Sequence, residues 1–392
     1  MIYKTKREKV DSYFMSENMS QSQLKLFIQG VDIYVAEKDK AQEKDKYYDE
    51  PAEHFIYGSA IDCKLTEEED SFNLRYHIST LDKKPSDAMI SIVKKVFDEI
   101  TEEIPFPDAS SVGAIDDYRE AFLRSCEYHT YQPKYGDDAK MNAIRTQATN
   151  YWNELIVSSN KQILTLENMI VINAVVESVL QDSNVGRFFL ANPDFPDVDI
   201  FHQFPIYTRI GGVQVKGLLD LLIIDHANAT ITICDFKTIG DTVLNFPRAL
   251  RRRRYDIQVA FYQSLLTSIW ENCSLEETLS ETYDLDSYSH NFNDYRILLP
   301  TFIVQSTKYN NNPVTYQTTP ELIQMGQSGR TDCVMAYVHV GSESNLNSIE
   351  MDDILGYSQL LIAYKDYQNG LTSHHPLKLV GWNSVKDLPN VQ

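Results

Sequence analysis

The sequence predicts an α/β fold in which helices flank a mixed central sheet. Residues 217–224 are almost wholly apolar, which is the pattern of a strand buried on both faces. Residues 230–238 follow after a short turn and are rich in β-branched side chains, so they predict a second strand. A Gly-Gly pair marks the turn of a hairpin over residues 205–215. Helical periodicity in residues 256–267 places a helix directly after the strands.

The chain of 392 residues is longer than a single minimal core requires. Residues 1–53 are expected to form an N-terminal helical and charged segment. Residues 54–392 are expected to form the main domain. Within it, mostly helical patterns predict an insertion at about residues 86–165, and an acidic stretch rich in Ser and Tyr opens a C-terminal extension over about residues 275–392.

Two acids and a lysine lie on the two predicted strands. Asp220 sits in the middle of the first apolar run, where a lone carboxylate is costly unless something pairs with it. Alternate residues of a strand face the same side, so Asp235 and Lys237 project together and Phe236 points away. A hairpin register brings this pair back beside Asp220. The sequence therefore predicts one pocket that contains two carboxylates and an ammonium group.

Such a pocket suits a hard divalent cation acting on a phosphodiester. Mg²⁺ and Mn²⁺ prefer oxygen ligands, which Asp220, Asp235 and the backbone carbonyl of Phe236 would supply. A cation held there would polarise the scissile phosphate and lower the pKa of a bound water. Lys237 would orient that water or neutralise charge that builds on the phosphoryl oxygens.

The following helix adds a polar pair. Gln258 and Tyr262 are four residues apart, so they point the same way. The amide is suited to hold the attacking water or a phosphate, and the hydroxyl is suited to touch the DNA backbone. The competing interpretation is an ordinary internal ion pair between Asp220 and Lys237, with a surface Gln and a half-buried Tyr. That interpretation leaves Asp235 without a role.

The short patterns are not specific by themselves. Asp138 and Lys140 repeat the D-x-K spacing in a polar stretch, and Gln203 and Tyr207 repeat the Q-x-x-x-Y spacing. The central set differs in its order, its spacing and its position on predicted buried strands.

These motifs, in this order, resemble the RecB-type branch of the PD-(D/E)XK nucleases, and within it the exonuclease VIII and phage-type exonuclease group. Residues 57–65 resemble the early helix of the group, and residues 171–190 resemble the helix before its first active-site strand. Residues 301–326 resemble the strands and helix that close the module. The likeness is strong only in residues 211–262. It implies a restriction-endonuclease-like fold and a metal-dependent deoxyribonuclease.

The resemblance also implies a third metal ligand. The early helix of the family carries a metal-binding His, and this chain has Asp62 at that position. A carboxylate is a hard ligand that can replace an imidazole for Mg²⁺ or Mn²⁺. If Asp62 is instead a solvated helix residue, Glu177 is the alternative third carboxylate, by analogy with relatives that use a helical acid.

The task implied by the resemblance is digestion of double-stranded DNA from the 5′ end, in phage or mobile-element recombination and repair. Relatives form rings around DNA, so a homo-oligomer and a single-strand annealing protein are implied partners. Two alternatives stay open. One is an endonuclease, single-strand or defence nuclease that uses the same site. The other is a nuclease-derived DNA-binding protein that no longer cuts, which the missing His motivates.

The net charge of −20 argues against nonspecific binding of nucleic acid over the whole surface. One segment of the chain is nevertheless locally basic. Five arginines precede the predicted helix that carries Gln258, and arginine is suited to phosphate contacts. The alternative is a solvated basic loop that balances nearby acids. The proposed DNA-binding residues are Arg248, Arg251, Arg252, Arg253 and Arg254.

The five cysteines lie far apart and include no C-x-x-C pair, so neither a structural zinc site nor an iron–sulfur cluster is expected from them. Free thiols and the lack of a signal-peptide pattern indicate a reducing cytoplasm, that of a bacterial or phage-infected cell if the resemblance holds. No apolar run approaches membrane-spanning length, so no membrane partner is expected.

Overall fold

The computed structural model divides into two compact units. The first combines Met1–Lys38, Tyr57–Ser71 and the chain from Ile172 onward, and the second combines Asp39–Ile56 and Phe72–Val171. The residues described are 1–42, 53–81, 85–103, 112–158, 161–190, 196–272, 274–286, 288, 290–309, 312–328, 334–340, 345–351 and 356–369.

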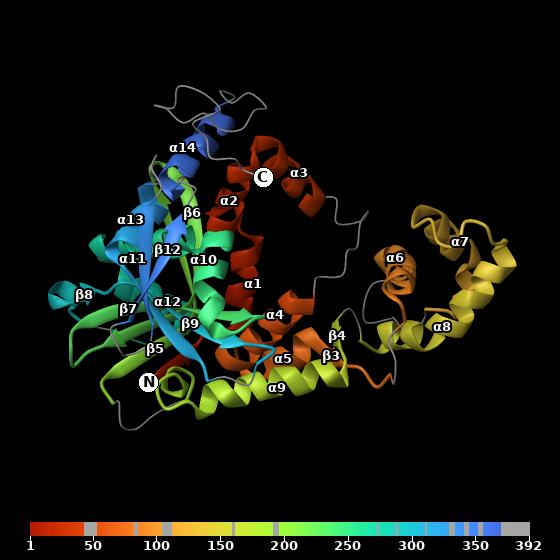
Figure 1. Cartoon of the computed structure of the whole chain (residues 1–392), viewed down its shortest axis with the longest axis horizontal. Coiled ribbons are helices and arrows are strands. Elements are labelled where there is room, and N and C mark those ends of the chain that lie inside the picture. The colour runs from red at the N-terminus through yellow and green to blue at the C-terminus, as the bar shows by residue number, and fades with distance from the viewer. Residues whose placement is uncertain are drawn as a thin grey trace. The chain divides into compact units, whose positions relative to one another are not determined.

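A mixed sheet forms the centre of the first unit, as expected for the α/β class (Figure 1). The strand order is β1-β5-β6-β7-β9-β10-β11-β12, with β2 added beside β6 and β8 beside β7. Neighbouring strands β5, β6 and β7 are antiparallel, whereas β9 runs parallel to β7. The strands are β1 (Ile2–Lys4), β2 (Met19–Ser20), β5 (Val198–Ile210), β6 (Val213–Asp225), β7 (Thr230–Ile239), β8 (Arg296–Ile297), β9 (Thr301–Ser306), β10 (Val314–Thr318), β11 (Val334–Val340) and β12 (Asn345–Met351).

The hairpin and the two strands predicted from the sequence are confirmed. Gly211 and Gly212 both have positive φ, 57° and 85°, which suits the two-residue turn between β5 and β6. Strands β6 and β7 pair in register from Asp225 opposite Thr230 to Leu221 opposite Cys234. This register is the one expected to bring the end of β7 back beside Asp220.

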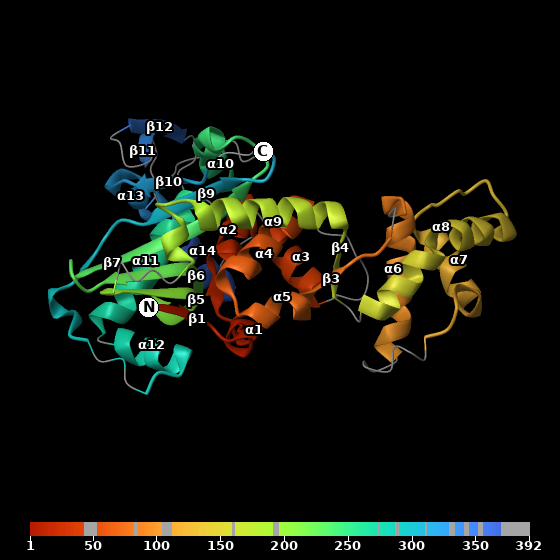
Figure 2. The same cartoon turned by 90° about the horizontal axis from the view of Figure 1, so that it is seen from below.

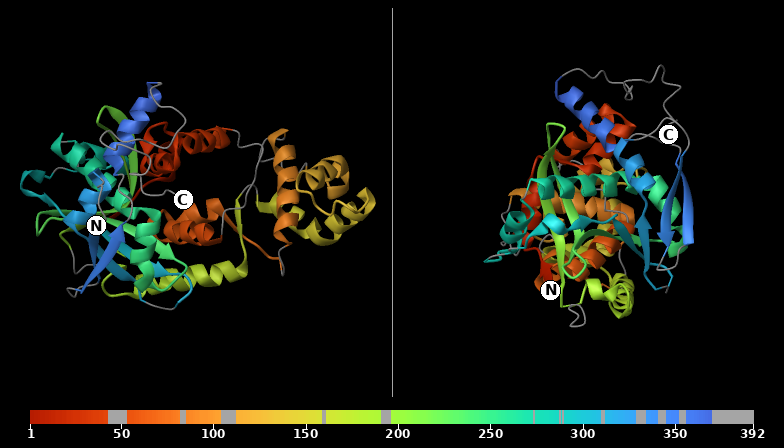
Figure 3. Two further views of the ribbon diagram at one scale, coloured as in Figure 1. Left: turned by 45° about the horizontal axis from the view of Figure 1, so that its top comes forward. Right: turned by 90° about the vertical axis from the view of Figure 1, so that its left-hand side faces the viewer.

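Helix α11 carries the polar pair and packs against β5, β6 and β7 (Figure 3). Its apolar stripe of Ile257, Phe261 and Leu265 is fully buried, as the periodicity predicted. In the described part of the chain, no helix is both long enough and apolar enough to span a bilayer. The helices that contribute to this unit are α1 (Arg7–Met15), α2 (Gln21–Gln29), α3 (Val31–Gln42), α4 (Glu53–Thr66), α5 (Glu69–Arg75), α9 (Leu166–Gln181), α10 (Phe246–Arg253), α11 (Tyr255–Glu271), α12 (Leu275–Tyr283), α13 (Pro320–Ser328) and α14 (Tyr357–Gln368).

The N-terminal residues belong to the sheet, although the sequence indicated a segment of its own over residues 1–53. Strand β1 pairs with β5 and strand β2 pairs with β6. Lys216 on β6 donates hydrogen bonds to the carbonyl oxygens of Tyr13 and Ser16, at 2.6 and 2.7 Å, and so satisfies the end of α1. Strands of two or three residues are too short to leave a periodic pattern. Residues 43–52 of the predicted segment lie outside the described residues.

The predicted extension over residues 275–392 contributes to the same sheet and core through β8 to β12, α13 and α14. Residues 370–392 of that extension lie outside the described residues.

The second unit is mainly helical and contains the insertion predicted at about residues 86–165. Helices α6 (Asp87–Glu103), α7 (Arg119–Tyr128) and α8 (Asp137–Ser158) lie together in this unit (Figure 2). They pack around Trp152, whose ring contacts the rings of Phe97 and Phe122. A small parallel sheet joins β3 (Tyr76–Ile78) to β4 (Gln162–Leu164).

Replacing Gly326 with Ala is expected to destabilise the first unit. A Cβ at this position of α13 would overlap the carbonyl oxygen of Asp256 on α11 and lie 2.9 Å from Ala260 Cβ. Because backbone cannot move away as a side chain can, we expect a loss of about 1–3 kcal/mol in the free energy of unfolding. Chemical denaturation would measure it. Gly240→Ala is the matched control, since its Cβ would meet nothing closer than 4.0 Å. Equal stability of the two variants would contradict the close packing of α13 on α11.

Candidate active site

Strands β6 and β7 part at the candidate site. Their pairing runs as far as Leu221 opposite Cys234, and β7 then continues beside β9 up to Ile239 opposite Ser306. At the fork, Asp220 Oδ2 accepts a hydrogen bond of 2.8 Å from the backbone N–H of Phe236. A side-chain oxygen thus replaces the backbone acceptor of the neighbouring strand, which satisfies the buried N–H where the ladder ends.

The two acids and the lysine converge as predicted. Lys237 Nζ lies 2.5 Å from Asp235 Oδ2 and 4.0 Å from Asp220 Oδ2. Asp235 is fully buried, whereas the side chains of Asp220 and Lys237 are 19% and 16% exposed. The cluster therefore opens to solvent on the side of Asp220 and Lys237. Phe236 faces the other way and meets the ring of Phe189 edge-on at 5.8 Å.

Gln258 supports the cluster from α11. Its Nε2 donates to Asp235 Oδ1 at 2.8 Å and lies 3.3 Å from the hydroxyl of Tyr262. The amide therefore orients a carboxylate, where the sequence predicted that it would hold water or phosphate. Tyr262 is only 6% exposed and packs in the main core, next to Gly217. The prediction that the Tyr262 hydroxyl contacts a DNA backbone is therefore wrong, because this side chain points from α11 into the protein interior.

Asp62 joins the same cluster from α4. The carboxylate of Asp62 is half-buried, and it interacts electrostatically with the charges of Asp235 and Lys237. Asp62 Oδ2 accepts a hydrogen bond of 2.9 Å from Gln203 Nε2. The alternative acid, Glu177, is exposed on α9 and accepts a hydrogen bond from Gln181 one turn further along. Of the two candidates for the third carboxylate, the geometry favours Asp62.

Gln203 is a site residue that the sequence did not reveal. Strand β5 pairs His202 with Leu221 and Phe204 with Leu219 in one continuous register, which places Gln203 opposite Asp220 at a position where the pairing is interrupted. Its φ of 53° is uncommon for a residue other than glycine. With this left-handed backbone, the amide donates hydrogen bonds to Asp62 and, at 3.1 Å, to Thr66. The sequence marks Gln203 only as a polar residue within an otherwise apolar strand. The Q-x-x-x-Y spacing of Gln203 and Tyr207 is too common to identify a site residue.

A second lysine approaches the cluster from α2. Lys25 Nζ donates to the carbonyl oxygen of Arg253 at 3.2 Å and lies 5.8 Å from the centre of the Tyr255 ring. Lys237 lies 5.3 Å from the same ring. Burial and the charge of Lys237 lower the pKa of Lys25 to about 8. No local pattern marks this residue, because more than 200 positions separate it from Lys237.

Charge crowding explains the altered acidities. Burial, and then the charge of Asp235, raise the pKa of Asp220 well above its ordinary value. Burial, and then the charge of Glu67, raise the pKa of Asp62 to about 7. Burial lowers the pKa of the Lys237 ammonium group. The negative charges of Asp235 and Asp220 have the opposite and larger effect, so the pKa is raised. Asp62, Asp220 and Asp235 thus outnumber the lysines Lys237 and Lys25, and this excess of negative charge favours a cation.

The donor set fits a hard cation. Asp62, Asp220 and Asp235 offer carboxylate oxygens, and the carbonyl oxygen of Phe236 lies 3.4 Å from Lys237 Nζ on the same side as the cluster. An all-oxygen set of this kind matches the preference of Mg²⁺ and Mn²⁺.

The arginines before α11 do not all remain at the surface. Arg248 and Arg252 are exposed on α10. Arg254 is buried at the junction of α10 and α11, with a φ of 52°. Its guanidinium group forms a bidentate ion pair with Asp256: Nε donates to Oδ1 and Nη2 donates to Oδ2, both at 3.0 Å. The prediction that Arg254 contacts DNA is therefore wrong, because its side chain is buried in the ion pair with Asp256.

Comparison of the sequence with protein-family models and with curated proteins finds no match.

Replacing Asp220 with Asn is expected to stabilise the metal-free protein at neutral pH. An acid whose pKa is raised on folding binds its proton more tightly in the folded state, so stability falls as pH rises from about 4 through the folded pKa. The Asn variant is free of this loss. Relative to wild type, we expect the free energy of unfolding of the Asn variant to be about 1 kcal/mol larger at pH 8 and unchanged at pH 4, since one pKa unit corresponds to about 1.4 kcal/mol.

Denaturation with a chelator present, repeated across this pH range, would measure the effect. Asp138→Asn is the matched control, because the side chain of Asp138 is 96% exposed. An Asp220→Asn protein that is less stable than wild type at pH 8 would contradict the crowding of negative charge.

Proposed function

We propose that this chain is a metal-dependent deoxyribonuclease of the restriction-endonuclease-like fold that hydrolyses phosphodiester bonds with Mg²⁺ or Mn²⁺. The observation that carries the proposal is the convergence of Asp220, Asp235 and Lys237 at a fork in the sheet, open to solvent on one side. An ordinary internal ion pair needs one acid, whereas here two acids lie within 4.0 Å of Lys237 and a third, Asp62, interacts electrostatically with it.

Each residue has a defined part in this proposal. Asp62, Asp220 and Asp235, with the carbonyl of Phe236, would hold the cation. When bound, the cation supplies a Lewis acid that polarises the phosphate and acidifies a water molecule. Lys237 carries its positive charge to the solvent-facing side, where it can donate a hydrogen bond to a phosphoryl oxygen or to the attacking water.

Two amides hold the acids in position for this chemistry. Gln258 fixes one oxygen of Asp235, and Gln203 fixes one oxygen of Asp62. Both amides come from elements that are packed into the core, so the carboxylates are oriented before any ligand arrives.

The order of the elements supports the finer fold assignment. Along the chain come α4 with Asp62, then α9, the active-site strands β6 and β7, α11 with Gln258, and β9. Each segment on which the resemblance to RecB-type nucleases rests is a helix or a strand as that resemblance implies.

DNA is the proposed substrate because an arginine-rich helix, α10, directly precedes the helix that carries Gln258. Arg248 and Arg252 are exposed on α10, directly before α11. With a net charge of −20, DNA would be attracted locally and repelled elsewhere. Double-stranded ends, 5′ polarity, a ring-shaped homo-oligomer, an annealing partner and a bacterial or phage-infected cytoplasm follow from the family resemblance alone.

Replacing Lys237 with Ala is expected to reduce cleavage of linear double-stranded DNA by at least about a hundredfold, because it removes a preorganised charge at the reacting phosphate. Release of nucleotides with Mg²⁺ or Mn²⁺ would be measured, with a chelator as the blank. Asp138→Asn, which alters the D-x-K pattern in the helical unit, is expected to retain wild-type activity.

The form of the DNA tests the finer task. Rapid digestion of linear DNA beside intact, covalently closed circles supports an exonuclease, and efficient cutting of circles indicates an endonuclease instead. Metal-independent release, or equal activity of the Lys237→Ala and wild-type proteins, would contradict the proposed site.

Replacing Arg248 and Arg252 together with Ser is expected to weaken DNA binding and flatten its dependence on salt. Each lost phosphate contact lowers the slope of log K against log salt concentration by about 0.9. Binding would be measured by fluorescence anisotropy in Ca²⁺ at several salt concentrations, with Arg119→Ser in the helical unit as the control. An unchanged slope would mean that these arginines do not contact phosphates.

A further inference from the structure

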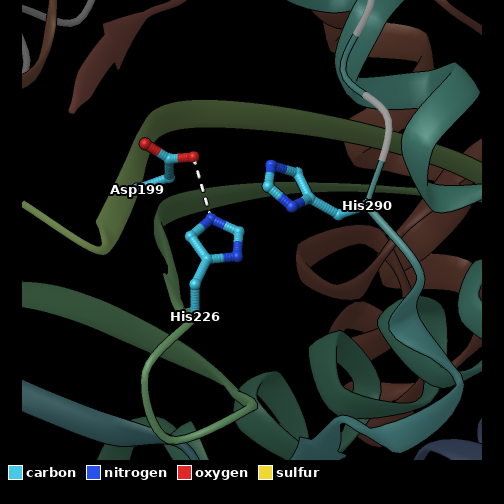
Figure 4. A group of neighbouring side chains, drawn as sticks. All are labelled: Asp199, His226 and His290. Atoms are coloured by element: carbon cyan, nitrogen blue, oxygen red, sulfur yellow. Dashed lines mark hydrogen bonds and ion pairs between the residues drawn. The ribbon is translucent and has the colours of Figure 1, made fainter.

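A second group of metal-ligating side chains lies at the far end of the β5–β6 hairpin. Asp199 comes from the start of β5, His226 from the turn after β6, and His290 from the segment before the short helix η5 (Phe292–Asp294) (Figure 4). One ligand atom from each residue lies within 4.8 Å of the other two. These residues are distant in sequence, and the sheet brings the first two together through its register.

Neighbouring hydroxyl groups orient this group. His226 Nε2 lies 3.0 Å from Asp199 Oδ2, and Tyr288 donates to the same oxygen at 2.9 Å. On its other side, His226 Nδ1 lies 2.7 Å from the hydroxyl of Tyr295. The other carboxylate oxygen of Asp199 is 2.9 Å from the amino group of Met1.

We propose that Asp199, His226 and His290 form a second cation site, which takes a borderline transition-metal ion such as Zn²⁺. Two imidazoles and one carboxylate are a donor set typical of zinc and poorly suited to Mg²⁺, which prefers oxygen alone. The expectation that no zinc site exists rested on the spacing of cysteines, and it does not bear on a site built from histidine.

The hydroxyl of Tyr295 allows the proton change that binding requires. Without a metal, His226 donates from Nε2 to Asp199, and Tyr295 donates to Nδ1. A metal needs the lone pair of Nε2, so the imidazole must carry its proton on Nδ1 instead. The hydroxyl of Tyr295 can then accept that hydrogen bond, because a phenol both donates and accepts.

Closing the site needs only a side-chain movement. Ligand atoms around a tetrahedral zinc ion with bonds of about 2.0–2.1 Å lie roughly 3.3 Å apart, so no separation among the three ligand atoms, which lie within 4.8 Å of one another, needs to shrink by more than about 1.5 Å. The rings of His226 and His290 now stack at 4.1 Å, with 24° between their planes. His290 is exposed, so its ring is free to turn toward the other two ligands.

The proposed site is separate from the carboxylate cluster. His226 follows Asp220 by six positions along β6, which corresponds to about 20 Å in an extended strand. An ion there would join the segment before η5 to the open end of the hairpin. Its expected effect is therefore on the stability of the fold.

The full-length protein would be titrated with Zn²⁺ by calorimetry, with excess Mg²⁺ present to occupy the carboxylate cluster. We expect His290→Ala and His226→Ala to bind one equivalent less than wild type, or to bind it at least tenfold more weakly. Tyr295→Phe is expected to weaken the same equivalent by about tenfold, as loss of a supporting hydrogen bond does. Zinc is also expected to raise the thermal midpoint of wild type more than that of His290→Ala.

His129→Ala, in the helical unit, removes an imidazole away from the group and is expected to bind as wild type does. Circular dichroism would verify that each variant is folded, and the exposed His290 is the safest position in this respect. Asp220→Asn is expected to lose cleavage and keep this zinc equivalent, so failure of the nuclease proposal and failure of the zinc site give different results. The same stoichiometry and affinity in both His variants as in wild type would overturn the proposal, as would a wild-type protein that binds no Zn²⁺.

Discussion

The buried ion pair between Asp235 and Lys237 is the interaction on which the candidate site depends. Taking two charges into the interior of a sheet costs more free energy than a surface pair recovers, unless hydrogen bonds satisfy the remaining atoms. Gln258 supplies one such bond to Asp235. The pair is also coupled to Asp220, which the fork in the sheet brings to the partly solvated side. The fold thus keeps a costly charged group beside a surface that solvent can reach.

Backbone irregularities do much of the positioning. The end of the β6–β7 ladder lets the Asp220 carboxylate accept a hydrogen bond from the N–H of Phe236, and the left-handed backbone of Gln203 in β5 accompanies the hydrogen bond from its amide to Asp62. Both features lie near one level of the sheet, because Gln203 falls between the residues that pair with Leu219 and Leu221. A regular ladder at this level would align the strands closely and point the Gln203 amide elsewhere. The strained φ of Gln203 is therefore consistent with a functional constraint.

The sequence predicted the part of the site that local patterns encode. Apolar runs define β6 and β7, and the period of a strand places Asp235 and Lys237 on one side. Asp62 required a family resemblance, since nothing in its own helix marks it as a ligand. Lys25 and Gln203 were missed because their positions depend on long-range packing and on a local interruption of the β5–β6 pairing. Arg254 and Tyr262 were misassigned because each meets a partner inside the protein, Asp256 and Gln258 respectively.

The two clusters of the first unit differ in the chemistry of their donors, and this difference bears on selectivity. Imidazole-containing sites bind zinc far more tightly than they bind magnesium, whereas a carboxylate site with a nearby lysine favours a cation that keeps its water. If zinc entered the carboxylate cluster, it would compete with the catalytic ion. An imidazole site on the same unit would hold zinc at a place where it only joins segments of the fold. If both proposals hold, the six positions between Asp220 in β6 and His226 just after it would keep the two cations apart.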